Sequence, residues 1–110
     1  MPSKWTVEIL NEKVVRELDA LPADMRARLA RIVELIELVG LENVGMPYIR
    51  PLEGKLWEMR MKGKDGIARA IYVTRRERRI VILHAFHKKS RKTPRSAIRL
   101  ALARMKEIEP

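Results

Sequence analysis

The chain has 110 residues, a net charge of +10 and no cysteine. A chain of this length fits one domain with one core, so we expect residues 1–110 to form a single domain. The lack of cysteine excludes disulfides, thiol nucleophiles and thiolate zinc sites. No apolar run approaches the roughly 18 residues of a membrane span, and the N-terminal residues 1–5 lack the apolar block of a signal peptide. We therefore expect a cytoplasmic protein without a membrane partner.

The positive charge lies in the second half of the chain. Residues 1–49 hold six Lys/Arg against eight Asp/Glu, a net charge of −2, whereas residues 50–110 hold eighteen against six, a net charge of +12. This asymmetry predicts an anionic partner, with nucleic acid first and acidic protein second. A basic surface that is merely solvated usually interleaves the two signs more evenly.

The first half predicts a short strand and two helices. Residues 5–10 begin with polar–apolar alternation and are rich in β-formers, which is typical of a strand. Asn11 is a good N-cap for a helix through about Ala20. A second helix has Pro22 in its first turn and ends at Gly40, so that the two form an antiparallel hairpin. Its apolar stripe, to which we give a structural role only, comprises Met25, Leu29, Ile32, Ile36 and Val39.

The second half predicts a sheet. Residues 41–54 contain two prolines and two glycines and read as a loop. Three strands follow, at residues 55–61, 67–73 and 79–84, separated by a hairpin turn and a charged turn. Four consecutive apolar residues in the last strand indicate a central strand covered on both faces.

A final helix completes the predicted fold. Thr93 is a natural N-cap and Pro94 a natural first helical residue. The element order is therefore β-α-α-β-β-β-α, an α+β domain with a mainly antiparallel sheet. Arg95 lies on the basic side of the final helix.

The connection from the last strand to this helix gives the strongest indication of a binding function. Five of the ten residues from 85 to 94 are Lys, Arg or His, and they accumulate just before a helix N-terminus. The macrodipole at that end disfavours cations and favours phosphate. So much positive charge is unfavourable there unless an anion binds, and RNA is the anion that we expect.

Strand alternation predicts which side chains share a face. Trp57, Met59 and Met61 should pack on the helical hairpin, which leaves Glu58 and Arg60 on a face that we expect to be open. If Arg69, in the next strand, lies beside Arg60, two guanidiniums meet on this surface. Farther along, Ile82, His84, Phe86 and, if the strand continues, Lys88 should follow one another on one side. Such a surface can hold phosphates with its cations and support a base with an aromatic ring or His.

Each of these residues also has a plain structural interpretation. Glu58 and Arg60 could form an ordinary ion pair, and Arg69 could support a loop. His84 could be a packed, hydrogen-bonded residue, and His87 could be simply exposed. The arginine run at residues 75–79 is better explained as a solvated turn. The Lys/Arg run at residues 88–92 is the hardest to dismiss, and it indicates binding rather than reaction.

Other chemistries find little support. The chain has no Gly-rich phosphate loop, no HExxH motif and no metal-type spacing of His. Two His residues three apart, with no carboxylate nearby in the sequence, make a poor metal site. A Ser-His-Asp hydrolase would lack its nucleophile elbow. We expect neither a metal nor a cofactor.

Four motifs in order resemble one known family. They are Leu56-Trp57-Glu58-Met59-Arg60, Gly66-Ile67-Ala68-Arg69-Ala70-Ile71-Tyr72, Ile82-Leu83-His84-Ala85-Phe86-His87-Lys88-Lys89 and Lys92-Thr93-Pro94. They resemble the pattern L-W-E-L-R, G-x-x-R-x-x-Y, L-H-x-F-x-K-K and K-T-P of the phage-derived, HigB-like branch of the RelE/ParE toxin superfamily. Residues 1–55 match that family only in length and layout.

The resemblance implies a small RelE-like domain, a twisted sheet with a helical hairpin on one face and a C-terminal helix. It implies a type II toxin–antitoxin toxin that cleaves mRNA in the ribosomal A site, near 16S rRNA, without a metal. The ribose 2′-oxygen attacks the adjacent phosphate in such enzymes. The implied partner is a cognate antitoxin, commonly of helix-turn-helix type, which neutralises the toxin.

The resemblance also implies roles for particular residues. Arg69 matches the arginine that RelE-type enzymes use on the phosphate, Arg60 is the matching strand arginine, and Lys88 and Lys89 fall where the later basic catalytic group lies. His84 joins this set as a candidate for proton transfer. RNA contacts are expected from His87, Arg91, Lys92 and Arg95. One departure affects the general base, because RelE carries a Tyr near its C-terminus and this chain has none after Tyr72.

Two alternatives share the expected fold. A ParE-like toxin would bind DNA gyrase and cleave nothing, and a catalytically inactive relative would only bind RNA. The basic connection and the paired strand arginines favour the nuclease, because gyrase binding requires no phosphate pocket.

Overall fold

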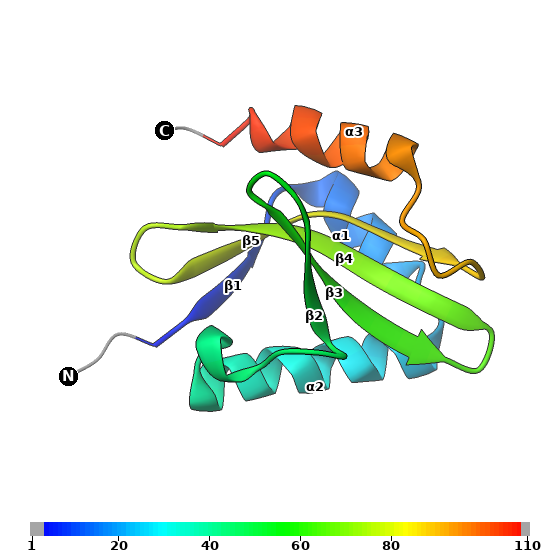
Figure 1. Ribbon diagram of the computed structural model, residues 1–110, viewed down its shortest axis with the longest axis horizontal. Coiled ribbons are helices and arrows are strands. Elements are labelled where there is room, and N and C mark those ends of the chain that lie inside the picture. Colours follow the sequence, from blue (N-terminus) through cyan, green and yellow to red (C-terminus); the bar gives the residue numbers. More distant parts are fainter. Residues whose placement is uncertain (1–3, 109–110) are drawn as a thin grey trace.

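A five-stranded sheet organises the protein (Figure 1). The computed structural model describes residues 4–108, so that most of residues 1–5, where no signal peptide was expected, lies outside the described residues. The strand order is β1-β5-β4-β3-β2, and only the β1–β5 pair is parallel. The predicted α+β class with a mainly antiparallel sheet is therefore confirmed. The strands are β1 (Thr6–Ile9), β2 (Ile49–Glu53), β3 (Leu56–Gly63), β4 (Gly66–Arg75) and β5 (Arg79–Lys88).

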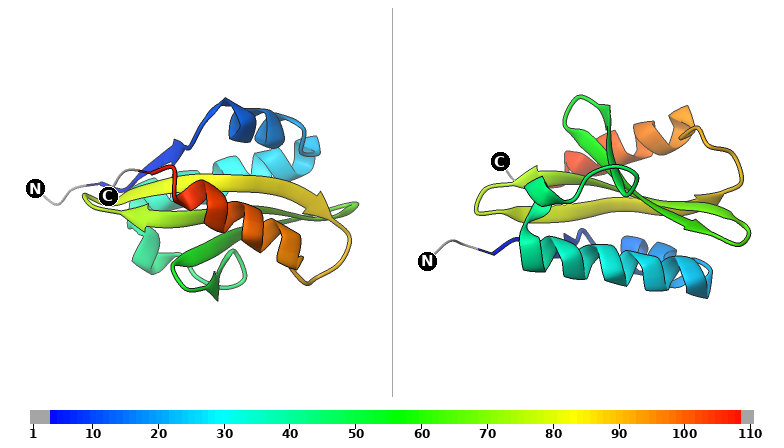
Figure 2. Two further views of the ribbon diagram at one scale, coloured as in Figure 1. Left: turned by 90° about the horizontal axis from the view of Figure 1, so that it is seen from above. Right: turned by 60° about the horizontal axis from the view of Figure 1, so that its bottom comes forward.

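Helices cover both faces of the sheet (Figure 2). On one face α1 (Glu12–Asp19) packs on β5 and α2 (Ala23–Val39) packs on β3. On the other face α3 (Arg95–Met105) packs on β5 and β4. Each face has its own apolar cluster, and β5 contributes to both, as its four apolar residues predicted. Within residues 4–108, no helix is long and apolar enough to cross a bilayer.

The apolar stripe of α2 packs as predicted except at its end. Met25, Ile32 and Ile36 are buried in the cluster between the helices and the sheet, and Leu29 is partly buried there. Val39 is 48% exposed, because the helix ends there and its last turn extends past the sheet contact.

Capping explains where the helices begin and end. Asn11 accepts a hydrogen bond of 3.1 Å from the Val14 N–H, which confirms the predicted N-cap. Gly40 follows α2 with a φ of 91°, a conformation that only glycine adopts easily. Pro22 and Pro94 each occupy the N-cap position, so that α2 and α3 begin one residue later than predicted. Thr93 was predicted to be the N-cap of α3, and this is wrong because its hydroxyl bonds to the sheet instead.

The sequence analysis missed β2. Residues 41–54 were predicted to be a loop, but they contain a short 3₁₀ helix, η1 (Leu41–Asn43), and the edge strand β2. β2 pairs only with β3 and contains Pro51, which an edge strand tolerates because one of its sides needs no ladder hydrogen bond. The prediction failed because an irregular edge strand accommodates prolines and glycines, which otherwise indicate a loop.

A β-bulge in β5 corrects the predicted side-chain order. Ile71 of β4 faces His84, whereas Tyr72 faces Ile82, so that Leu83 is an extra residue. Ile82 consequently packs under α1 and α2, while Phe86 packs on the α3 side. The prediction that Ile82 and Phe86 share one side is wrong, since the bulge reverses the alternation between them. The strand does continue to Lys88, as that prediction required.

Candidate functional site

Two rows of side chains across the sheet bring arginines together on the α3 face. In one row Arg60 faces Arg69 on the neighbouring strand, and Arg69 faces Phe86 on the next. In the adjacent row Arg50 of β2 faces Glu58 of β3. Facing residues of antiparallel strands share one side of the sheet, so Arg50, Arg60 and Arg69 lie on the same side as Glu58. Arg50 was not singled out from the sequence, because it lies in the strand that was predicted to be a loop.

The centre of this cluster is buried. Arg69 is 0% exposed and Glu58 is 1% exposed, while the side chain of Arg60 keeps 12% exposure. Glu58 Oε1 lies 3.9 Å from Arg69 Nε, and Oε2 lies 3.8 Å from Arg60 Nη1. Burial and then the neighbouring Arg60 lower the pKa of Arg69 from its ordinary value. The prediction of an open face is wrong here, because other parts of the chain cover Glu58 and Arg69.

The cover is the connection between β5 and α3, residues 89–94, which we call the β5–α3 loop. Arg69 Nη2 donates a hydrogen bond of 2.6 Å to the Ser90 carbonyl, and Arg60 Nη2 donates one of 3.0 Å to the Arg91 carbonyl. The Thr93 hydroxyl donates a third bond, of 2.6 Å, to Glu58 Oε1. The loop therefore binds the arginine cluster through its backbone and through one buried side chain.

The remaining contacts of Arg69 include an aromatic ring. Its guanidinium carbon lies 5.9 Å from the centre of the Phe86 ring, and Nη1 donates to the Ile67 carbonyl at 3.3 Å. Phe86 in turn stacks on His84, with ring centres 5.1 Å apart and an interplanar angle of 26°. Phe86 thus separates His84 from the arginine, so the two predicted catalytic residues are linked through a ring and not by direct contact.

His84 belongs to a second polar cluster. Its Nδ1 lies 2.9 Å from Glu17 Oε1, and Arg104 of α3 donates to Glu17 and to the Leu83 carbonyl, each at 2.9 Å. Burial opposes ionisation of Glu17, but hydrogen bonds from Arg104, His84 and the Ala85 N–H outweigh it and lower the pKa of this carboxyl.

The sequence analysis found no carboxylate near the histidines, because Glu17 lies 67 residues away from His84 in the chain. Neither Glu17 nor Arg104 carries a local sequence signal that would have indicated this pairing.

The other predicted residues lie around the cluster at different places. Arg91 contributes its carbonyl to Arg60, as described, and its side chain is exposed, as are those of Lys88, Lys89 and Lys92. Arg95, also exposed, pairs with Glu53 at the end of β2. His87 points to the opposite face of the sheet, where its Nε2 lies 2.7 Å from the Asp65 carbonyl. His87 is therefore not brought to the arginines.

The side chains of Arg60 and Arg69 are of a type that suits an anionic ligand. Arginine guanidiniums are the groups best suited to phosphate, since they donate two parallel hydrogen bonds and stay charged. Within residues 4–108, no group of three or more His, Cys, Asp or Glu is placed to hold a metal ion.

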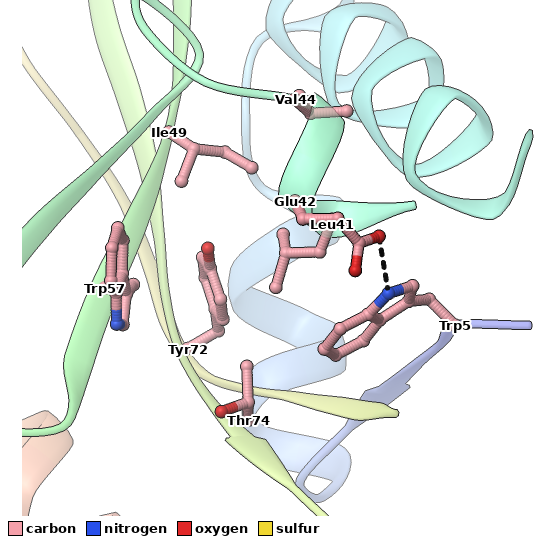
Figure 3. A pocket seen from close by; sticks show the side chains of 8 residues that line it. All are labelled: Trp5, Leu41, Glu42, Val44, Ile49, Trp57, Tyr72 and Thr74. Carbon is pink, nitrogen blue, oxygen red and sulfur yellow. Dashed lines mark hydrogen bonds between the residues drawn. The ribbon is translucent and has the colours of Figure 1, made fainter. Parts of the chain in front are cut away.

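A pocket opens on the other face of the sheet (Figure 3). It has a volume of about 400 Å³ and contains none of the predicted site residues. Trp5 donates to Glu42 at its rim, over 3.3 Å. The buried Tyr72 hydroxyl finds no hydrogen-bond partner among the described residues, and burial raises the pKa of this phenol. The lining residues are Trp5, Leu41, Glu42, Val44, Ile49, Trp57, Tyr72 and Thr74.

Solved structures with a similar overall fold define the fold class of this chain. A mutant of the E. coli toxin RelE in the free state matches with a TM-score of 0.63 and 11% identity, covering 94% of this chain and 98% of RelE. The archaeal RelE–RelB complex from Pyrococcus horikoshii OT3 contains a chain that matches with a TM-score of 0.56 and 24% identity, covering 81% and 99%. The fold is thus of the RelE type.

The sequence itself identifies the family. Residues 16–106 match the family described as "Phage derived protein Gp49-like", and the chain therefore belongs to it. No curated protein matches the sequence significantly. The phage-derived family and the RelE-type fold together confirm the resemblance to the RelE/ParE toxin superfamily.

Proposed function

We propose that this protein is the toxin of a type II toxin–antitoxin system and acts as a ribosome-dependent mRNA endonuclease of the HigB-like branch. The observation that carries the proposal is the pairing of Arg60 with Arg69 directly beneath a cationic loop. Neither a plain surface ion pair nor a solvated charge run accounts for two guanidiniums held side by side on the sheet, where like charges repel.

In this proposal the arginine pair binds the scissile phosphate. The ribose 2′-oxygen attacks the adjacent phosphorus and the bond to the 5′-oxygen breaks, which yields a cyclic phosphate and a free 5′-hydroxyl. The phosphoryl oxygens gain negative charge in the transition state. Fixed guanidinium donors stabilise that charge without having to reorganise, so Arg60 and Arg69 act as the electrostatic catalysts.

Residues around the pair take the remaining roles. Lys88 and Lys89 lie at the junction of β5 and the loop, and they are candidates for the later basic catalytic group. His84 is a candidate for proton transfer, although Glu17 holds its Nδ1 and Phe86 separates it from Arg69. The exposed side chains of Arg91, Lys92 and Arg95 would follow the RNA backbone. His87 lies on the opposite face and would contact RNA only beyond the sheet edge.

The proposal includes a partner and a location. A cognate antitoxin, of helix-turn-helix type, would neutralise the protein, and the ribosome, near 16S rRNA of the A site, would present the mRNA in the cytoplasm. One of the similar structures is a RelE–RelB complex, which supports the expectation of a protein partner for this fold.

One observation favours a different function. Arg69 is completely buried in the free protein and touches no solvent, as would suit a ParE-like gyrase inhibitor or a catalytically inactive relative. A nuclease requires that the β5–α3 loop moves away from this residue when RNA binds.

Cell-free translation with primer extension on the message tests the proposed function. We expect translation to stop and discrete new 5′ ends to appear only when ribosomes are present. A 2′-deoxynucleotide placed at the mapped cleavage site should prevent cleavage there. An intact message combined with inhibited DNA supercoiling would contradict the proposal and support the gyrase inhibitor.

A further inference from the structure

The β5–α3 loop closes over the arginine pair. Its backbone carbonyl oxygens accept the hydrogen bonds that the guanidiniums would otherwise donate to an anion. The Ser90 carbonyl accepts from Arg69 Nη2 at 2.6 Å, and the Arg91 carbonyl accepts from Arg60 Nη2 at 3.0 Å. These are guanidinium N–H groups, the donors that bind phosphate oxygens. Two carbonyl oxygens from consecutive residues therefore stand where phosphate oxygens would bind.

The side chains of the same loop oppose this closed position. Lys89, Arg91 and Lys92 are exposed cations on a segment whose backbone covers two more cations. Like charges on the loop and beneath it repel one another, so the loop stays closed only through attractive contacts. A polyanion would neutralise the loop and compete for the guanidiniums at once.

One side-chain contact holds the loop in place. Thr93 is 8% exposed, and its hydroxyl donates to Glu58 Oε1 at 2.6 Å. Glu58 is the same carboxylate that lies within 4 Å of Arg60 and Arg69. A hydrogen bond to a buried carboxylate is stronger than one between neutral groups. The carboxylate that balances the arginines thus also fixes the segment that covers them.

We infer that Thr93 and Glu58 form a latch that keeps the phosphate-binding arginines closed in the free protein, and that RNA binds by displacing the β5–α3 loop. Thr93 is a positioning residue in this account, since it acts through the loop and touches no RNA. This inference rests on the proposed function for the identity of the anion. The latch itself can be measured without RNA.

Trypsin provides that measurement, because it cleaves after Arg91 and attacks the carbonyl that Arg60 holds. Thr93→Val removes the hydroxyl at nearly constant volume, and Thr93→Ser retains it. We expect cleavage after Arg91 to be about tenfold faster in Thr93→Val, the change expected for loss of one hydrogen bond to a charged group. Thr93→Ser should behave like the wild type. Cleavage in the β4–β5 turn at residues 76–78 serves as the internal reference.

The wild type offers a second measurement if Thr93→Val fails to fold. Inorganic phosphate should compete with the loop carbonyls and accelerate cleavage after Arg91 relative to the turn, whereas sodium chloride at equal ionic strength should not. An unchanged cleavage rate after Arg91, in Thr93→Val or with phosphate, would overturn the latch.

Measurements of RNA affinity distinguish a failure of the latch from a failure of the proposed function. A short RNA whose 2′-oxygens are methylated, so that they cannot attack the phosphate, should bind Thr93→Val about tenfold more tightly than the wild type, because less of the protein is closed. Arg69→Gln should weaken this binding. If trypsin shows the latch opening while Arg69→Gln binds the RNA as well as the wild type, the latch stands and the RNA site is refuted.

Discussion

Arg60 and Arg69 are direct cross-strand neighbours whose guanidiniums share one buried carboxylate, that of Glu58. Like charges that face each other across an antiparallel pair destabilise a sheet. Glu58 offsets this repulsion, and the loop carbonyls of Ser90 and Arg91 each accept one guanidinium N–H, whereas the buried Arg69 Nε finds no hydrogen-bond partner among the described residues. One carboxylate and two loop carbonyls thus hold two like charges together on the sheet.

Glu58→Gln should destabilise the fold. The substitution removes the buried negative charge that lies within 4 Å of both Arg60 and Arg69, and breaking a buried ion pair typically costs about 3 kcal/mol. Urea denaturation should show a lower midpoint with an unchanged slope. Glu53→Gln removes an exposed carboxylate that pairs with Arg95, and it should leave the midpoint nearly unchanged. Equal effects of the two substitutions would contradict the role given to Glu58.

Glu17→Gln should destabilise the protein in a pH-dependent way. The pKa of Glu17 is lowered in the folded state, so its ionised form contributes stability above the pKa of an unfolded glutamate, about 4.3. This contribution is lost as the pH falls through the lower, folded-state pKa.

We therefore expect Glu17→Gln to lose about 1 kcal/mol at pH 7 and almost nothing near pH 3, measured by urea denaturation at both pH values. A deficit of the same size at both pH values would show that the charge of Glu17 is not what stabilises its contacts with His84 and Arg104.

Tyr72→Phe should stabilise the protein. The Tyr72 hydroxyl is buried without a hydrogen-bond partner among the described residues, which costs free energy that phenylalanine does not incur. A gain of about 1 kcal/mol would raise the melting temperature by roughly 4 °C, measured by calorimetry. Tyr48→Phe, at a position with 42% exposure, should change little. A lower melting temperature for Tyr72→Phe would mean that the hydroxyl has a partner after all.

The sequence predicted the elements that have strong local signals. Alternation along residues 55–61 and 67–73 assigned a face to each strand arginine, and the structure confirms the hypothesis that Arg60 and Arg69 lie side by side. Asn11 and Gly40 marked helix ends correctly because capping is a local property. The apolar run in β5 indicated a strand covered on both faces, which is also confirmed.

Long-range features could not be predicted in this way. The bulge at Leu83 depends on how two strands pair, and it moved Phe86 onto the side of Arg69. Glu17 meets His84 only because α1 packs on β5. The burial of Glu58 arises from the β5–α3 loop. The charged side chains of this loop indicate an exposed segment, but its backbone covers the arginines and Thr93 bonds to Glu58.

The most direct test of the account compares two arginine substitutions in ribosome-dependent mRNA cleavage, measured by primer extension. Arg60→Gln removes a guanidinium from the proposed phosphate site, whereas Arg31→Gln removes one from the exposed surface of α2. The account predicts that Arg60→Gln reduces cleavage about 100-fold, as loss of one transition-state donor does, and that Arg31→Gln cleaves like the wild type. Unimpaired cleavage by a folded Arg60→Gln protein would contradict it.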